Sequence, residues 1–194
     1  MAERVRARDL LREARQAFDA PSSPLARSAS AAWKGGFASG GRWMDEGLGY
    51  FRGTPPAGPS AGLNALGLLK YGLAGAGALV CVAAAVPLRQ PLVAVLCVPV
   101  FYAIEAQMVF LFPVALDGSP SPFREARRWT VRAGGTLAVL GVVMPLAFTM
   151  VFGGFAGRGF VRSWCLGCLA VCAWYERLRL AREPATTLLV PNRE

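Results

Sequence analysis

The chain has 194 residues, of which 54% are hydrophobic and 17% are charged, with a net charge of +9. A typical soluble domain has about 25% charged residues, so this composition argues against a soluble enzyme and against intrinsic disorder. The sequence contains no His, which removes the commonest metal ligand and the usual base at neutral pH, and we therefore expect neither a metal site nor a cofactor.

Residues 1–60 are predicted to form a cytoplasmic segment that contacts a surface. The apolar residues of positions 2–20 recur at helical spacing. A row of basic residues runs beside them and consists of Arg4, Arg8, Arg12 and Arg15. Such a row fits anionic lipid headgroups, and it fits equally a solvated helix or a helix packed on a partner. No motif that binds nucleic acid accompanies the basic residues, so nucleic acid is not an expected partner.

The stretch 21–60 is rich in Ser, Gly, Ala and Pro but also carries aromatic residues. Trp and Tyr favour the headgroup layer of a membrane. We therefore interpret positions 31–52 as a segment that contacts lipid or docks on a partner. The alternative is a loop whose aromatic side chains only cover the rest of the protein. The aromatic residues are Trp33, Phe37, Trp43, Tyr50 and Phe51.

Residues 61–180 are predicted to form an all-α transmembrane bundle of four helices. Between Tyr71 and Leu116 only Arg89 and Glu105 are charged, and positions 133–157 carry no charge. A membrane helix needs about 20 mostly apolar residues. Short links join the spans into two hairpins, and residues 181–194 follow as a cytoplasmic tail. The predicted spans are about 68–88, 91–116, 133–157 and 159–176.

The basic residues predict the orientation of this bundle. Ten Lys and Arg residues precede Tyr71, and four more lie in the connection between the second and third spans. The first hairpin turn has only Arg89, and the second has Arg158 and Arg162. The positive-inside rule then places both termini in the cytoplasm and both turns outside. The abundance of Arg, Ala and Gly suggests a GC-rich bacterial genome, so we expect a multi-pass protein of a bacterial inner membrane.

Glu105 is the most informative single residue of the spans. It lies fourteen positions after Pro91, which is about 21 Å into a hydrocarbon layer of about 30 Å. A carboxyl group at that depth faces the bundle interior, finds a partner or stays protonated. Tyr102 shares its helix face, Gln107 lies nearby on another face, and Lys70 can reach toward it from the cytoplasmic boundary. Glu105 is therefore either a proton or ligand site, or a carboxyl group that holds helices together.

Cys165 and Cys168 form a CxxC motif at the start of the last span, and Cys172 follows on the same face. A thiol near a helix N-terminus has a lowered pKa and can be redox active. This layout resembles the membrane thiol oxidoreductases, such as the vitamin K epoxide reductase family, which are four-helix bundles with a CxxC near the outer face. The resemblance implies a thiol–disulfide activity. Those families use a second cysteine pair in an exposed loop or partner, and neither outer turn of this chain holds one.

The sequence predicts a non-enzymatic integral membrane protein, which would act as a scaffold, accessory or assembly subunit. Its expected partners are the lipid bilayer and other membrane proteins or further copies of itself. Catalytic triads that depend on His are excluded, and no phosphate-binding loop motif is present. The first alternative is a proton or small-solute transport subunit centred on Glu105. The second is a thiol–disulfide oxidoreductase that uses Cys165 and Cys168.

Overall fold

The computed structural model describes residues 5–58 and 62–181, and every regular element within them is helical. This confirms the predicted all-α class. Arg4 and positions 182–194 of the predicted tail lie outside the described residues. The elements are α1 (Ala7–Asp19), α2 (Leu25–Lys34), α3 (Gly36–Arg52), α4 (Leu63–Leu88), α5 (Pro91–Val95), α6 (Cys97–Gln107), α7 (Leu111–Leu116), α8 (Pro122–Arg132), α9 (Gly135–Gly153), the π-helical turn η1 (Gly154–Arg158) and α10 (Phe160–Leu180).

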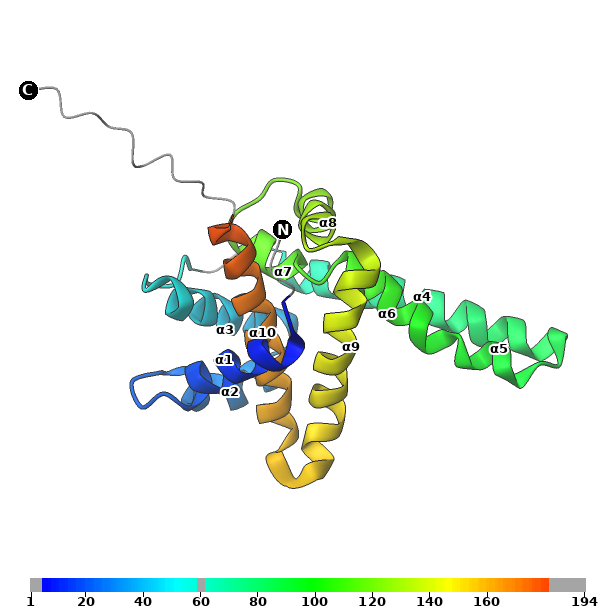
Figure 1. Cartoon of the computed structure of the whole chain (residues 1–194), viewed down its shortest axis with the longest axis horizontal. Helices are drawn as coiled ribbons and strands as arrows, with labels where there is room; N and C mark the ends of the chain where they lie inside the picture. Colours follow the sequence, from blue (N-terminus) through cyan, green and yellow to red (C-terminus); the bar gives the residue numbers. More distant parts are fainter. Residues whose placement is uncertain (1–4, 59–61, 182–194) are drawn as a thin grey trace, which may run out of the picture.

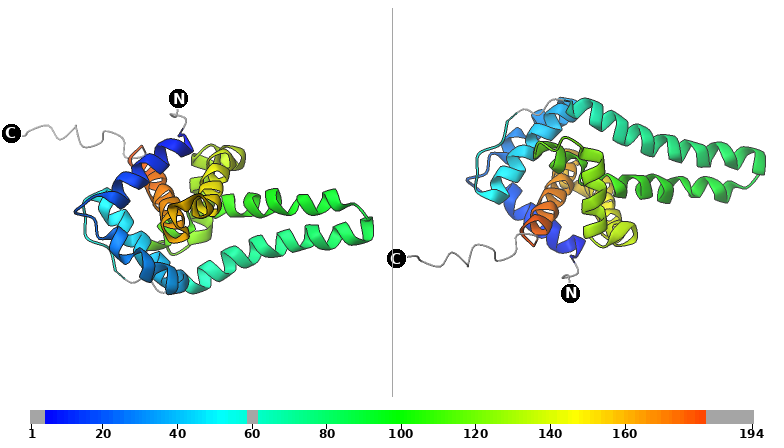
Figure 2. Two further views of the ribbon diagram at one scale, coloured as in Figure 1. Left: turned by 90° about the horizontal axis from the view of Figure 1, so that it is seen from below. Right: turned by 90° about the horizontal axis from the view of Figure 1, so that it is seen from above.

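Two long helical hairpins set the shape of the molecule (Figure 1). In the first hairpin, α4 runs outward and α5 and α6 return along it. In the second, α9 packs on α10. Figure 2 shows that the two hairpins run crosswise, because α9 and α10 are seen nearly end-on where α4 and α6 lie lengthwise. The structure therefore does not confirm a four-helix bundle, in which the hairpins would lie side by side.

Three segments among the described residues are long and apolar enough to cross a membrane, as judged by length and composition. They are Leu63–Pro87, Cys97–Leu116 and Gly135–Gly157. They overlap the first three predicted spans and are compatible with a membrane protein. The predicted fourth span lies in α10, which is not among these segments. That helix carries Arg162 near its start and Glu176, Arg177 and Arg179 near its end.

The hydrophobic core lies where the N-terminal helices meet α7, α9 and α10. The stripe of apolar residues on α1 buries Leu10, Ala14 and Phe18, and α1 packs mainly on α10. The Trp43 indole of α3 is 1% exposed, and its Nε1 donates a hydrogen bond to the Leu25 carbonyl of α2 at 3.0 Å. Residues 1–60 were predicted as a segment outside the bundle, whereas α1–α3 share one core with the later helices.

Candidate functional site: a pocket with a buried ion pair

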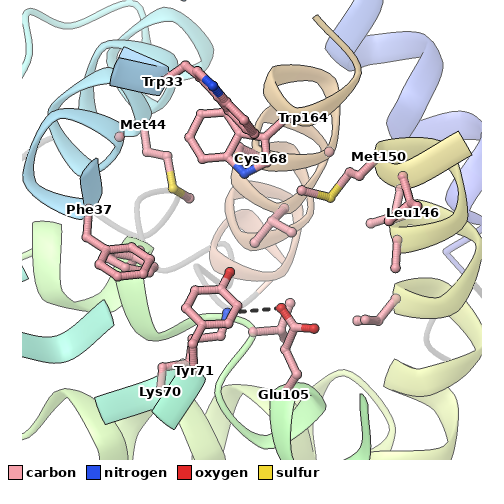
Figure 3. A pocket seen from close by; sticks show the side chains of 18 of the residues that line it. Trp33, Phe37, Met44, Lys70, Tyr71, Glu105, Leu146, Met150, Trp164 and Cys168 are labelled. Carbon is pink, nitrogen blue, oxygen red and sulfur yellow. Dashed lines mark ion pairs between the residues drawn. The ribbon is translucent and has the colours of Figure 1, made fainter. Parts of the chain in front are cut away.

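A pocket of about 800 Å³ lies where α2, α3, α4, α6, α9 and α10 come together. Its walls are mostly apolar and aromatic, as Figure 3 shows for Phe37, Met44, Leu146 and Trp164. Pockets that bind small molecules typically measure about 300–1,000 Å³ and combine apolar walls with a few polar groups. This pocket therefore has the size and lining expected of a ligand site.

The polar groups of the pocket are centred on Lys70 and Glu105, whose side chains are only 5% and 16% exposed. Lys70 Nζ lies 3.4 Å from Glu105 Oε1, because α4 and α6 pack directly against each other. Lys70 Nζ also lies 5.0 Å from the ring centroid of Tyr71 and 5.9 Å from that of Phe112. Aromatic faces at such distances attract a cation, so rings and a carboxylate together compensate the buried ammonium charge.

The structure brings together three of the four residues proposed from sequence as an intramembrane polar site. Tyr102 lines the pocket with Lys70 and Glu105. Gln107 does not join them, because its Nε2 donates a hydrogen bond to Thr136 Oγ1 on α9. The helical period explains this difference, since positions 105 and 107 are about 200° apart around one helix.

The five aromatic residues of the N-terminal segment do not form one surface. Trp33 and Phe37 line the pocket, whereas Trp43 is buried in the core. Tyr50 and Phe51 lie at the end of α3, where their rings meet edge to face at 5.7 Å between centroids. These residues lie on helices and not in a loop, so successive rings point to different sides.

The basic row of α1 faces away from the core. Arg8, Arg12 and Arg15 are exposed, and Arg12 pairs with Asp9 at 3.1 Å within the same helix. The apolar stripe beside this row is covered by α10 of the same chain. The described part of α1 is therefore packed on its own chain through its apolar stripe, and only its charged side is free to meet another surface.

The cysteines do not form the exposed redox pair that the CxxC motif suggests. All five are free thiols, and Cys165 and Cys172 are fully buried. Burial raises the pKa of Cys165 to about 12 and raises the pKa of Cys168 as well. The expected lowering by the helix N-terminus is absent because desolvation of the thiolate outweighs it. Cys168 alone lines the pocket.

A second polar cluster, which the sequence analysis did not predict, joins the ends of three helices. The Arg52 guanidinium at the end of α3 contacts Asp117 Oδ1 at 2.7 Å and, through Nε, Glu176 Oε1 at 2.8 Å. Tyr175 donates its hydroxyl hydrogen to Asp117 Oδ2 at 2.7 Å. Burial lowers the pKa of Arg52, but hydrogen bonds and charge from Glu176 and Asp117 outweigh this and raise it. This cluster fastens α3 to α7 and α10.

Comparison of the sequence with protein-family models finds no match. The curated proteins and the solved structures give no match either. The function of the pocket is therefore inferred from its own residues.

Proposed function

We propose that the protein is a non-enzymatic membrane protein that binds an amphipathic, membrane-soluble molecule in this pocket. The observation that carries the proposal is an apolar cavity of about 800 Å³ lined by the buried Lys70–Glu105 pair. A buried ion pair often stabilises a fold no more than apolar residues of the same volume would. Its position on the wall of a ligand-sized cavity therefore supports a role in recognition.

The exposed residues that line the pocket indicate where a ligand enters. Trp33, Phe155 and Phe160 are 48%, 76% and 48% exposed. Phe155 and Phe160 belong to the turn of the second hairpin, beside a segment apolar enough for a membrane. Figure 3 shows Trp33 on the opposite side of the pocket from Lys70 and Glu105. A ligand from the lipid would thus insert its polar head toward the ion pair and leave its apolar part near the mouth.

The charges of the site favour an uncharged polar head group. Lys70 supplies hydrogen-bond donors and Glu105 supplies acceptors, and their opposite charges balance each other. An anionic head would meet the Glu105 carboxylate, and a cationic head would meet the Lys70 ammonium. A hydroxyl or amide head both donates and accepts hydrogen bonds, and it adds no charge to the buried pair.

Quenching of tryptophan fluorescence tests this proposal, because Trp33 and Trp164 line the pocket. The full chain in detergent would be titrated with a monoacylglycerol that carries bromine on its chain. We expect saturable quenching that weakens at least about tenfold in affinity, or about 1.4 kcal/mol, in the double variant Lys70→Met, Glu105→Leu. The control is Gln107→Leu, which removes a polar group from the same helix outside the pocket. Quenching that does not saturate, or that is equal in the double variant, would reject the proposal.

The scaffold role predicted from the sequence is a second candidate with less structural support. Small residues on one face of the first span could let another membrane protein approach closely, but they serve packing within the chain: Ala74 is fully buried, and Gly77 lies against Val100 and Ile104 of α6. A pull-down in mild detergent tests the role, because a stoichiometric co-purifying membrane protein would support it and its absence would count against it.

The transport and redox alternatives can be tested on the same protein. A proton-handling role requires that Glu105→Gln abolish function while abundance and fold are unchanged. A redox role requires that Cys165 and Cys168 form a disulfide under oxidising conditions. We also propose that the protein lies in a bacterial inner membrane with both termini cytoplasmic, because the Arg residues are concentrated in the termini and in the middle connection.

A further inference from the structure

We infer that, among the described helices, only the α4–α6 hairpin crosses the bilayer, and that α9 lies along the membrane surface with one face in lipid. This inference is independent of the ligand proposed above. It places the turn at Arg158 on the same side as the connection at Gly118, whereas the sequence analysis placed that turn on the opposite side.

One face of α9 and η1 is apolar and exposed. Leu137, Phe148 and Phe155 are 84%, 64% and 76% exposed. With Met144 and Phe152 they are separated by seven, four, four and three positions, which is the spacing of a single helix face. The opposite face is buried in the core and includes Val139, Val142, Val143 and Leu146. Lipid can therefore reach α9 from one side only.

The other side of the second hairpin is covered by charged helices. Helix α1 lies on α10 and forms ion pairs with both of its ends: Asp19 with Arg162 at 2.6 Å, and Glu13 with Arg177 at 2.6 Å. The outward side of α1 carries the exposed Arg8, Arg12 and Arg15. If the second hairpin crossed the bilayer, α1 would enter the hydrocarbon layer with these charges, which that layer strongly disfavours.

The outer part of the first hairpin exposes many large apolar side chains. Leu79, Val86 and Leu92 are 68%, 76% and 75% exposed. No other described helix lies along the outer part of this hairpin (Figure 2). Such a surface is stable only when hydrocarbon surrounds it, so this hairpin is the element that spans. Because the second hairpin runs crosswise to it (Figure 1), α9 then lies in the plane of the membrane.

Helix α8, which precedes α9, supports lipid as the occupant of the exposed face of α9. Helix α8 ends three residues before α9 begins. Its buried side includes Ala126 and Trp129, and its exposed side carries Arg124, Arg127, Arg128 and Arg132. A cationic surface beside an apolar stripe complements anionic headgroups beside acyl chains. The exposed apolar face of α9 thus lies next to the basic side of α8 at the N-terminal end of α9.

Labelling of introduced cysteines from one side of the membrane tests this inference. Gln90→Cys, Ala156→Cys and Arg124→Cys would be made in the full chain and treated with a membrane-impermeant maleimide in oriented vesicles. The parent protein measures the background from its native thiols. We expect Ala156→Cys and Arg124→Cys to react from the same side, and Gln90→Cys from the other. Reaction of Ala156→Cys from the side of Gln90→Cys would overturn the inference.

A depth measurement decides the case in which Ala156→Cys is reached from neither side. A nitroxide attached at Phe148→Cys would be compared with one at Leu79→Cys by collision with oxygen and with a polar nickel reagent. A shallow position for Phe148 and a deep one for Leu79 support the in-plane helix. Equal, deep positions for both would contradict it.

Discussion

Each hairpin contains a long helix that is apolar enough to cross a membrane, α4 in the first and α9 in the second, but different partners surround these two helices. In the first, α4 pairs with α6, and Gly77 lets the two helices approach through Ile104. In the second, α9 pairs with α10, whose Arg162 and Arg177 form ion pairs with α1. Hydropathy alone would assign α9 to the bilayer interior together with α4 and α6. The way in which an apolar helix meets the membrane therefore depends on its partner helix and on the helices that cover that partner.

A large loss of folding stability is expected at the Arg52 cluster, which joins the end of α7, where the first hairpin returns, to the end of α10 in the second hairpin. Arg52→Met leaves Glu176, whose side chain is 6% exposed, with Arg179 at 2.8 Å as its remaining cationic partner. Removal of one member of a buried pair costs about 3–5 kcal/mol of folding free energy. We expect a loss at the lower end, about 3 kcal/mol, because Glu176 keeps Arg179 and because Asp117, the other partner of Arg52, is partly exposed. Thermal unfolding in detergent measures this. The matched control is the exposed Arg42→Met, and equal losses in the two variants would show that the cluster does not hold the hairpins.

A lysine placed on each hairpin distinguishes a spanning helix from a surface helix. Leu79 and Phe148 have similar exposure, 68% and 64%. Leu79→Lys is expected to cost about 2.5–3.5 kcal/mol of insertion free energy because its charge enters the hydrocarbon centre. Phe148→Lys should cost under about 1 kcal/mol because the ammonium group reaches the headgroups. The fraction of protein that resists alkaline extraction from membranes measures both, and equal losses would remove the difference between the hairpins.

Glycine substitutions compare the packing inside each hairpin. A Cβ at Gly167 of α10 would meet the Met150 side chain, and a Cβ at Gly77 of α4 would meet Ile104. Overpacking costs about 1–3 kcal/mol. We expect Gly167→Val to cost about 3 kcal/mol in the core, and Gly77→Val about 1 kcal/mol where the hairpin can move apart in lipid. Melting temperatures in detergent test the order, and a reversed order would show that the first hairpin is the more rigid one.

The smallest effect is expected for the ion pair at the start of α10. Asp19 and Arg162 have side chains that are 53% and 35% exposed, and exposed pairs contribute about 0.2–1 kcal/mol. Asp19→Asn should therefore lower the free energy of unfolding by about 0.5 kcal/mol or less, and the loss should vanish at high salt. A loss above about 2 kcal/mol that persists in salt would indicate a pair held in hydrocarbon, and hence a second hairpin that crosses the membrane.

Much of the secondary structure could be predicted from the sequence, because long uncharged runs leave few alternatives to membrane helices. The approach of Lys70 to Glu105 could also be predicted, because the depth of each residue in the membrane follows from its position along its helix. The crosswise course of the hairpins could not, because hydropathy carries no information on the direction of a helix.

Long-range contacts explain the remaining differences between sequence and structure. Arg52 lies 65 positions from Asp117 and 124 from Glu176, and no local pattern pairs residues so far apart. The Gly-rich stretch that forms α3 has low intrinsic helix propensity. There, burial of Trp43 and Leu48 and the close approach of Gly41 to Leu63 favour the helix.

The indole rings described above have an optical consequence. Trp164 lies 5.4 Å from Trp33 at the mouth of the pocket and 6.4 Å from Trp43 in the core, measured between ring centroids. At such separations, excitation energy migrates from one indole to the next before it is emitted as light. The three rings therefore emit as one coupled group. A quencher at the mouth of the pocket also reduces the emission of Trp43, which is buried in the core.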